Sequence, residues 1–214
     1  MTDEQTQVKT IDPRFSSLSE KQLELLREYV GDVVATDSSI EAALDRQLAM
    51  AKGDALMAPV AREFHDTVRD QRNAMISLRD AMAVGDDASS GNSLKEKGAT
   101  VLGAVAGVIE KVRSEGLSKS LRDDYTSFST ASIGYTMLLT TAKAMGSADV
   151  AMAAERGLRT YASGIQKINQ VMPALLITEL DGDEGVVKNP AVADDVRSII
   201  NSVWKETDQS NGKH

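Results

Sequence analysis

The sequence of 214 residues contains no cysteine, only four prolines, and few aromatic residues, namely three Phe, four Tyr and one Trp. The absence of cysteine excludes disulfides, thiolate zinc sites and thiol nucleophiles. Strands are enriched in aromatic side chains, and proline interrupts helices, so the scarcity of both kinds of residue favours a helical chain.

Histidine occurs only at His65 and His214. A Ser-His-Asp triad would therefore depend on His65. This residue falls on a polar part of a predicted long helix, and we expect its side chain to be solvated. Catalytic candidates are few as a result, and the sequence favours a protein that is not an enzyme and needs no cofactor.

The chain carries 32 acidic against 24 basic residues, a net charge of −8. Nucleic acids and anionic membranes are bound mainly through clustered Lys and Arg, so this balance argues against both kinds of partner. No apolar run approaches the roughly 20 residues that a membrane-spanning helix needs. The first residues are polar and acidic, unlike a signal peptide, and we expect a cytoplasmic protein.

Apolar residues recur at helical spacing along the chain, and they predict an all-α protein. Capping boxes at Ser17–Glu20 and Ser38–Glu41 predict a first helix that breaks near Thr36 and a second that ends near Gly53. The later helices are expected from Asp54 to Met82, from Ser93 through Val101–Ile109, from Ser120 to Gly146, from Ala148 past a kink at Pro173, and from Asn189 to about Trp204.

These segments predict one domain, an antiparallel four-helix bundle over residues 17–207 with extra N- and C-terminal helices. Residues 1–16 and 208–214 are expected to be flexible tails. The last two long helices should share a core because their large apolar residues alternate by four and three. That predicted core consists of Phe128, Tyr135, Tyr161, Ile165 and Ile168.

Short hydroxyl side chains gather on one face of the helix expected to end at Gly146. They are Thr126, Ser129, Thr136 and Thr140. Solvated helix faces usually carry Lys, Glu and Arg, so we predict that this face contacts another helix. Its partner is either residues 101–109 of the same chain, where Gly103 and Gly107 permit close approach, or a second copy of the protein. A weakly polar, solvated face is the alternative.

The segments Ser132–Tyr135 and Thr141–Gly146, followed by a long helix, resemble the ferritin-like stress-protein family typified by YciE and YciF. A weaker likeness runs from Ser38 to Met82, and together these segments cover about two thirds of the chain. The resemblance implies a ferritin-like bundle and a role in stress. It also implies a di-iron site formed by Glu and Glu-x-x-His motifs from four helices.

The sequence departs from the family at those iron ligands. No Asp, Glu or His occurs between Tyr125 and Ala148, so one helix offers no ligand. The family pattern matches acidic residues only at Glu41, Asp70 and Glu155, and Ala74 stands where a partner of Asp70 is expected. We therefore expect no metal in the bundle core.

Three functions remain open. The favoured one is a non-enzymatic bundle that binds a second copy of itself or another protein under stress. The second is a ferritin-like metal-binding protein or oxidase with an atypical site at Glu41, Asp70 and Glu155. The third is a carrier of a small apolar ligand in the bundle core.

Overall fold

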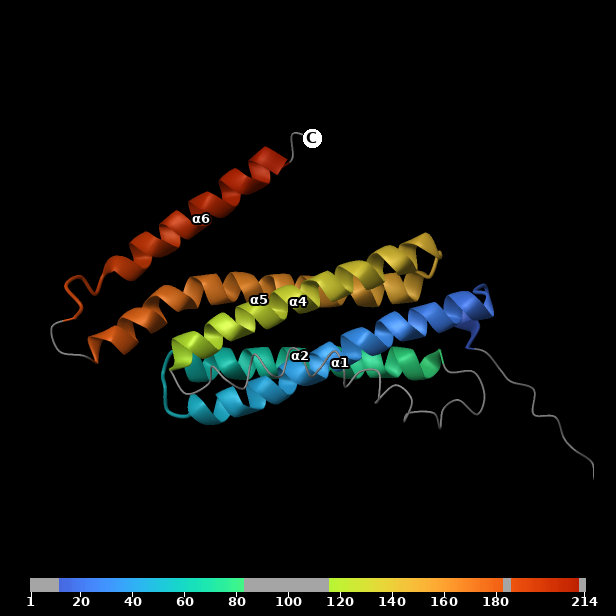
Figure 1. The fold of residues 1–214 in the computed structure, drawn as a ribbon, viewed down its shortest axis with the longest axis horizontal. Coiled ribbons are helices and arrows are strands. Elements are labelled where there is room, and N and C mark those ends of the chain that lie inside the picture. The colour runs from blue at the N-terminus through green and yellow to red at the C-terminus, as the bar shows by residue number, and fades with distance from the viewer. Residues whose placement is uncertain (1–11, 83–115, 183–185, 212–214) are drawn as a thin grey trace, which may run out of the picture.

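The computed structural model describes residues 12–82, 116–182 and 186–211, and in these ranges it is helical without any strand. A short 3-10 helix precedes five α-helices (Figure 1). The elements are η1 (Pro13–Phe15), α1 (Glu20–Met50), α2 (Met57–Ala81), α4 (Leu117–Ala144), α5 (Ala148–Asp181) and α6 (Val192–Asn211). The predicted all-α class is confirmed for the described residues.

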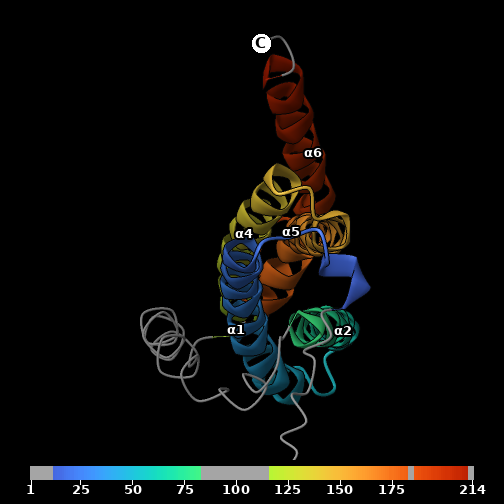
Figure 2. The same ribbon diagram turned by 90° about the vertical axis from the view of Figure 1, so that its right-hand side faces the viewer.

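The four long helices α1, α2, α4 and α5 lie side by side (Figures 1 and 2). Helix α1 packs on α2 and α4, and α5 packs closely on α4 and more loosely on α2. Neighbouring helices run in opposite directions, whereas α2 and α4 run in the same direction (Figure 1). Helix α6 packs on α5 and projects away from the bundle (Figures 1 and 2).

The core runs along the length of this bundle and contains the apolar stripes that the sequence indicates. The apolar residues that recur at helical spacing along α2 and its C-cap are all buried, namely Val60, Phe64, Val68, Met75, Leu78 and Met82. Of the five residues predicted to join the last two long helices, four are at most 2% exposed, and Ile165 packs partly buried against the same cluster. The aromatic rings of Phe64, Phe128, Tyr161 and Tyr135 form a continuous series through the centre.

The predicted break in the first helix is wrong. Helix α1 is continuous because the hydroxyls that suggested a new start bond to their own helix: Thr36 Oγ1 donates to the Asp32 carbonyl, and Ser38 Oγ donates to the Val34 carbonyl. Its N-cap is Ser19, with Gln22 completing the capping box, two residues later than predicted. The predicted N-terminal tail also contains a fixed part, because Phe15 is fully buried.

The other helix ends agree better with the predictions. The Asp54 carboxylate accepts hydrogen bonds from the backbone amides of Leu56 and Met57 at the start of α2. Gly53 and Gly146, the predicted stops, both have positive φ. Helix α4 begins at Leu117 instead of Ser120, and α6 continues past Trp204 to Asn211, into the predicted tail. The helix predicted from Ser93 lies outside the described residues.

None of the described helices is long and apolar enough to cross a bilayer.

Candidate functional site

The hydroxyl face predicted for protein contact lies on the outer side of α4. Thr126, Thr136 and Thr140 are exposed and Ser129 is half-buried. Each hydroxyl donates to the backbone carbonyl four residues earlier, at distances from 2.8 Å for Ser129 to 3.4 Å for Thr126. The face therefore presents methyl groups and satisfied hydroxyls, which cost less to desolvate than free polar groups.

Two large apolar residues occupy the centre of this face. Ile133 is 63% exposed and Met137 is 50% exposed. Ile133 lies four residues after Ser129 and three before Thr136, so all three share one side of the helix. Neither apolar residue was predicted to belong to this face, although both lie at helical spacing from its hydroxyl residues. We call these six residues (Thr126, Ser129, Ile133, Thr136, Met137 and Thr140) the α4 face.

No described helix covers the α4 face. Helix α4 packs on α5 through Phe128 and Tyr135 and on α1 through the side that carries Asp124, both away from this face. The predicted internal partner, residues 101–109 with Gly103 and Gly107, lies outside the described residues. A helix side that combines exposed Ile and Met with short hydroxyl residues is typical of a contact surface.

The three acids of the metal alternative are separated in the structure. Glu41 faces the core, but its carboxylate pairs with Arg72 at 2.6 Å. Asp70 is exposed beside Arg69, and Glu155 is half-buried and pairs with Arg159 at 2.6 Å. Among the described residues, no group of three or more His, Asp or Glu side chains could hold a metal ion.

A buried polar cluster occupies the centre of the bundle instead. The Asp37 carboxylate on α1 accepts hydrogen bonds from the hydroxyls of Tyr135 on α4, at 2.6 Å, and of Tyr161 on α5, at 2.5 Å. Gln71 on α2 donates its amide to the Tyr135 hydroxyl at 3.2 Å. Three helices thus meet at one carboxylate, and α2 joins the cluster through the hydrogen bond from Gln71 to Tyr135. The adjacent Glu41–Arg72 pair is a polar contact between α1 and α2.

Burial dominates the electrostatics of this cluster. Asp37 is fully buried, and desolvation raises its pKa to about 6, although both tyrosine hydroxyls and the nearby Arg72 act in the opposite direction. The pKa of each tyrosine is raised well above its usual value by burial and by the Asp37 charge, so both phenols stay protonated. Asp37 is therefore a proton-binding group near pH 6, and it lines neither of the two clefts described below.

His65 is also more constrained than predicted. Its side chain is only 14% exposed, and it lies between Asp45 on α1 and Asp66 on α2, with nitrogen–oxygen distances of 3.0 and 3.3 Å. The expectation of a solvated histidine is wrong because α1 passes beside this turn of α2. No described serine contacts the ring, so the arrangement is an inter-helix contact and not a triad.

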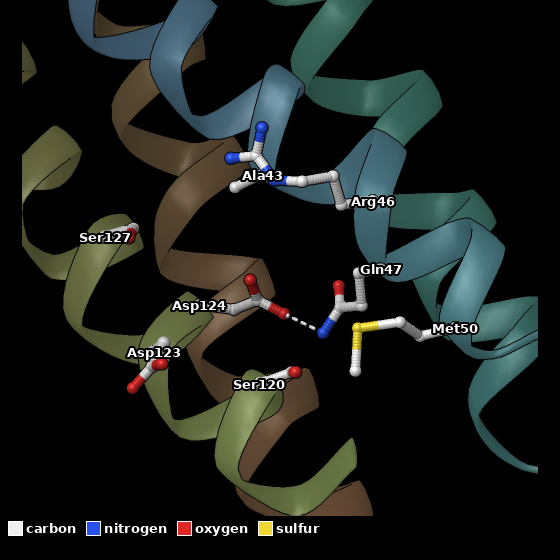
Figure 3. A pocket seen from close by; sticks show the side chains of 8 residues that line it. All are labelled: Ala43, Arg46, Gln47, Met50, Ser120, Asp123, Asp124 and Ser127. Atoms are coloured by element: carbon white, nitrogen blue, oxygen red, sulfur yellow. Dashed lines mark hydrogen bonds between the residues drawn. The ribbon is translucent and has the colours of Figure 1, made fainter. Parts of the chain in front are cut away.

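A small cleft lies between α1 and α4 (Figure 3). The Gln47 amide donates to Asp124 at 2.6 Å within it, and both residues are buried. Ser120, Asp123 and Ser127 face this pair from α4. The cleft has a volume of about 10 Å³, the size of a single water site, which is too small for an organic ligand.

Helix α6 presents a second exposed apolar surface. Ile199, Val203 and Trp204 are between 52% and 61% exposed. The helix is held to α5 by polar contacts, in which Arg197 donates to the Gln170 carbonyl at 2.7 Å and Gln170 donates to Asn201 at 2.8 Å.

No protein-family model, curated protein or solved structure shows a significant match to this chain.

Proposed function

We propose that this protein is a non-enzymatic helical bundle that associates with a second copy of itself through the α4 face. Its architecture is proposed to be ferritin-like, without a working di-iron centre, and the family resemblance adds a role under stress. The observation that carries the association is the exposure of Ile133 and Met137 at the centre of an uncharged helix face.

The chemistry of the α4 face supports association with an identical surface. With a net charge of −8, two copies repel each other, and an uncharged contact surface adds no further repulsion between facing charges. A two-fold interface brings the same patch of both subunits together, and hydroxyl residues around Ile and Met are compatible with their own copy. Short side chains also permit two helices to approach closely.

Two features support the ferritin-like part of the proposal. Helices α2 and α4 run in the same direction, a relation that needs one long crossover connection, as ferritin-like bundles have (Figure 1). The centre of the bundle is polar and draws on four helices. The Glu41 carboxylate already pairs with Arg72, which supports a bundle centre held together by polar side-chain contacts in place of a metal.

The test is the sedimentation of the full chain and of Thr136→Glu/Thr140→Glu. We expect a wild-type dimer and a folded, monomeric variant, because two carboxylates on the α4 face would be buried without partners in the dimer. The matched control is Asn73→Glu/Ser77→Glu, at two exposed positions of α2. These residues have the same spacing, and Ser77 bonds back to the Asn73 carbonyl as Thr140 does to that of Thr136.

The control variant should remain dimeric. A wild-type protein that stays monomeric at high concentration contradicts the proposal. So does a Thr136→Glu/Thr140→Glu protein that still dimerises. If this variant unfolds while the wild type is monomeric, the α4 face is an internal contact, and the proposal of self-association is wrong.

A further inference from the structure

A groove runs between α2 and α5, on the side of the bundle where two neighbouring helices pack least closely. Its volume is about 340 Å³, within the usual range of small-molecule sites. Its floor is formed by the buried residues Phe64, Val68, Phe128 and Tyr161.

The floor of the groove is rigid. The rings of Phe64 and Phe128 lie 5.0 Å apart edge to face, and those of Phe128 and Tyr161 lie 5.3 Å apart. The Phe128 ring is further fixed against Gly164, where a Cβ atom would come within 2.6 Å of it. A floor that is already ordered does not lose conformational entropy when a ligand binds.

The rim of the groove is basic although the whole chain is acidic. Arg156, Arg159 and Lys167 all come from α5, and the only acidic residue in the lining is Glu63 on α2. The rim also carries the hydroxyls of Thr160 and Ser163, which are further hydrogen-bond donors, whereas the Thr67 hydroxyl donates to the Glu63 carbonyl. Positive charge beside an apolar floor suits a molecule with an anionic head and an apolar body.

The ion pairs at the rim indicate how much charge the ligand carries. Lys167 pairs with Glu63 across the groove at 3.1 Å, and Arg159 pairs with Glu155 at 2.6 Å. Arg156 is exposed and forms no ion pair with any described residue. One cation is therefore left for one negative charge, and a guanidinium binds a carboxylate through two parallel hydrogen bonds.

From this combination we propose that the α2–α5 groove binds an amphipathic monoanion of the fatty carboxylate class. The carboxylate lies at Arg156, beside the Arg159–Glu155 ion pair, and the alkyl chain lies over Phe64 and Phe128. The site is separate from the α4 face, and binding does not depend on self-association.

Calorimetric titration of the full chain with dodecanoate, below its micellar concentration, tests this site. We expect one equivalent to bind, and we expect dodecan-1-ol and dodecyltrimethylammonium to bind at least tenfold more weakly. Arg156→Gln/Arg159→Gln should weaken dodecanoate binding at least tenfold. The matched double variant Lys21→Gln/Lys52→Gln, at two exposed positions of α1 and the turn that follows it, should leave binding unchanged.

Two further variants distinguish this groove from non-specific adsorption. Ser163→Trp, at an exposed rim position, should block binding while the helix content stays constant. Glu63→Gln should tighten binding several-fold, because it releases Lys167, whereas the exposed control Glu24→Gln changes the net charge equally and should have no effect. Equal affinity for the alcohol, or dodecanoate binding that Ser163→Trp leaves intact, overturns the proposal.

Discussion

At the scale of single residues, Asp37 connects the helices of the bundle and also destabilises it. Its carboxylate accepts two short hydrogen bonds from Tyr135 and Tyr161, yet full burial raises its pKa from 3.8 to about 6. Between these two values the folded protein holds a proton that the unfolded chain releases. Stability from this group is therefore present at low pH and lost as the pH rises toward 6.

The substitution Asp37→Asn tests this pH dependence. A shift of about two pKa units corresponds to about 3 kcal/mol in all, and about 2 kcal/mol of this falls between pH 4 and pH 6. The free energy of unfolding of the variant, relative to wild type, should therefore rise by about 2 kcal/mol over that range. Urea unfolding at a series of pH values measures it. Exposed Asp70→Asn is the control and should show no such trend. A constant difference between Asp37→Asn and wild type across this range would contradict the assignment.

The core position of Asp37 can be inferred from the sequence, but it was not predicted. The residue lies seven positions after Val30 and seven before Leu44, and both are buried, so it belongs to the apolar stripe of α1. The predicted break near Thr36 hid this continuity. Its tyrosine partners, by contrast, were predicted as core residues from their spacing, because aromatic residues carry the same periodic signal whether or not their hydroxyls are bonded.

At the scale of helices, the close packing of α4 on α5 depends on glycine. A Cβ atom at Gly157 would lie 2.2 Å from the Tyr135 ring, and at Gly164 it would lie 2.6 Å from the Phe128 ring. The Tyr135 ring cannot shift easily, since its hydroxyl is bonded to Asp37 and Gln71. Two aromatic side chains of α4 thus fill the space that two glycines of α5 leave open.

Gly157→Ala should therefore destabilise the protein by about 3 kcal/mol, the upper part of the range for an overpacked core, although Ala favours helices by about 1 kcal/mol over Gly. Gly134→Ala, on the side of α4 that faces α1, is the matched control. A Cβ atom there would meet only Val33 at 3.6 Å, an ordinary contact, so we expect no loss or a small gain. Thermal unfolding compares the two variants, and equal effects would rule out the steric explanation.

The start of α4 depends on a residue that is distant in sequence. The Glu179 carboxylate on α5 accepts hydrogen bonds from the Ser118 backbone amide, at 2.8 Å, and from the Ser118 hydroxyl. The local pattern at Ser120–Asp123 predicted a start three residues later. No local signal identifies a cap supplied from 61 residues away, which is why sequence periodicity found this helix but not its first residue.

Glu179→Ala should cost about 1–2 kcal/mol, the usual effect of losing a helix N-cap. The same change should increase the hydrogen-exchange rate of the Ser118 amide, which then has no carboxylate acceptor. Glu206→Ala, an exposed position on α6, serves as the control. A full loss of exchange protection along α4 would instead show that the cap is needed for the whole helix.

At the scale of the whole molecule, the all-α class was accessible from the sequence, whereas the α2–α5 groove was not. Helical periodicity and the glycine stops predict the long helices, and burial of the α2 stripe confirms their facing. The α2–α5 groove was not predicted, because it depends on how loosely two distant helices pack. The charged residues along its rim come from α2 and α5, and only the fold brings Lys167 beside Glu63.

Self-association through an uncharged face makes a specific prediction about salt. Each chain carries a net charge of −8, so two copies repel each other while the α4 faces contribute no compensating ion pairs. Raising NaCl from about 0.1 M to about 1 M shortens the Debye length from about 10 Å to about 3 Å and screens that repulsion. The dimer dissociation constant, measured by sedimentation, should therefore fall as salt is added.

Two charge variants test the same repulsion. Asn73→Glu/Ser77→Glu, which adds two negative charges away from the α4 face, should make the dissociation constant depend more steeply on salt, and Glu20→Gln/Glu24→Gln should make it depend less steeply. A dissociation constant that rises with salt would mean that ion pairs hold the two chains together, and the uncharged α4 face would then be the wrong surface.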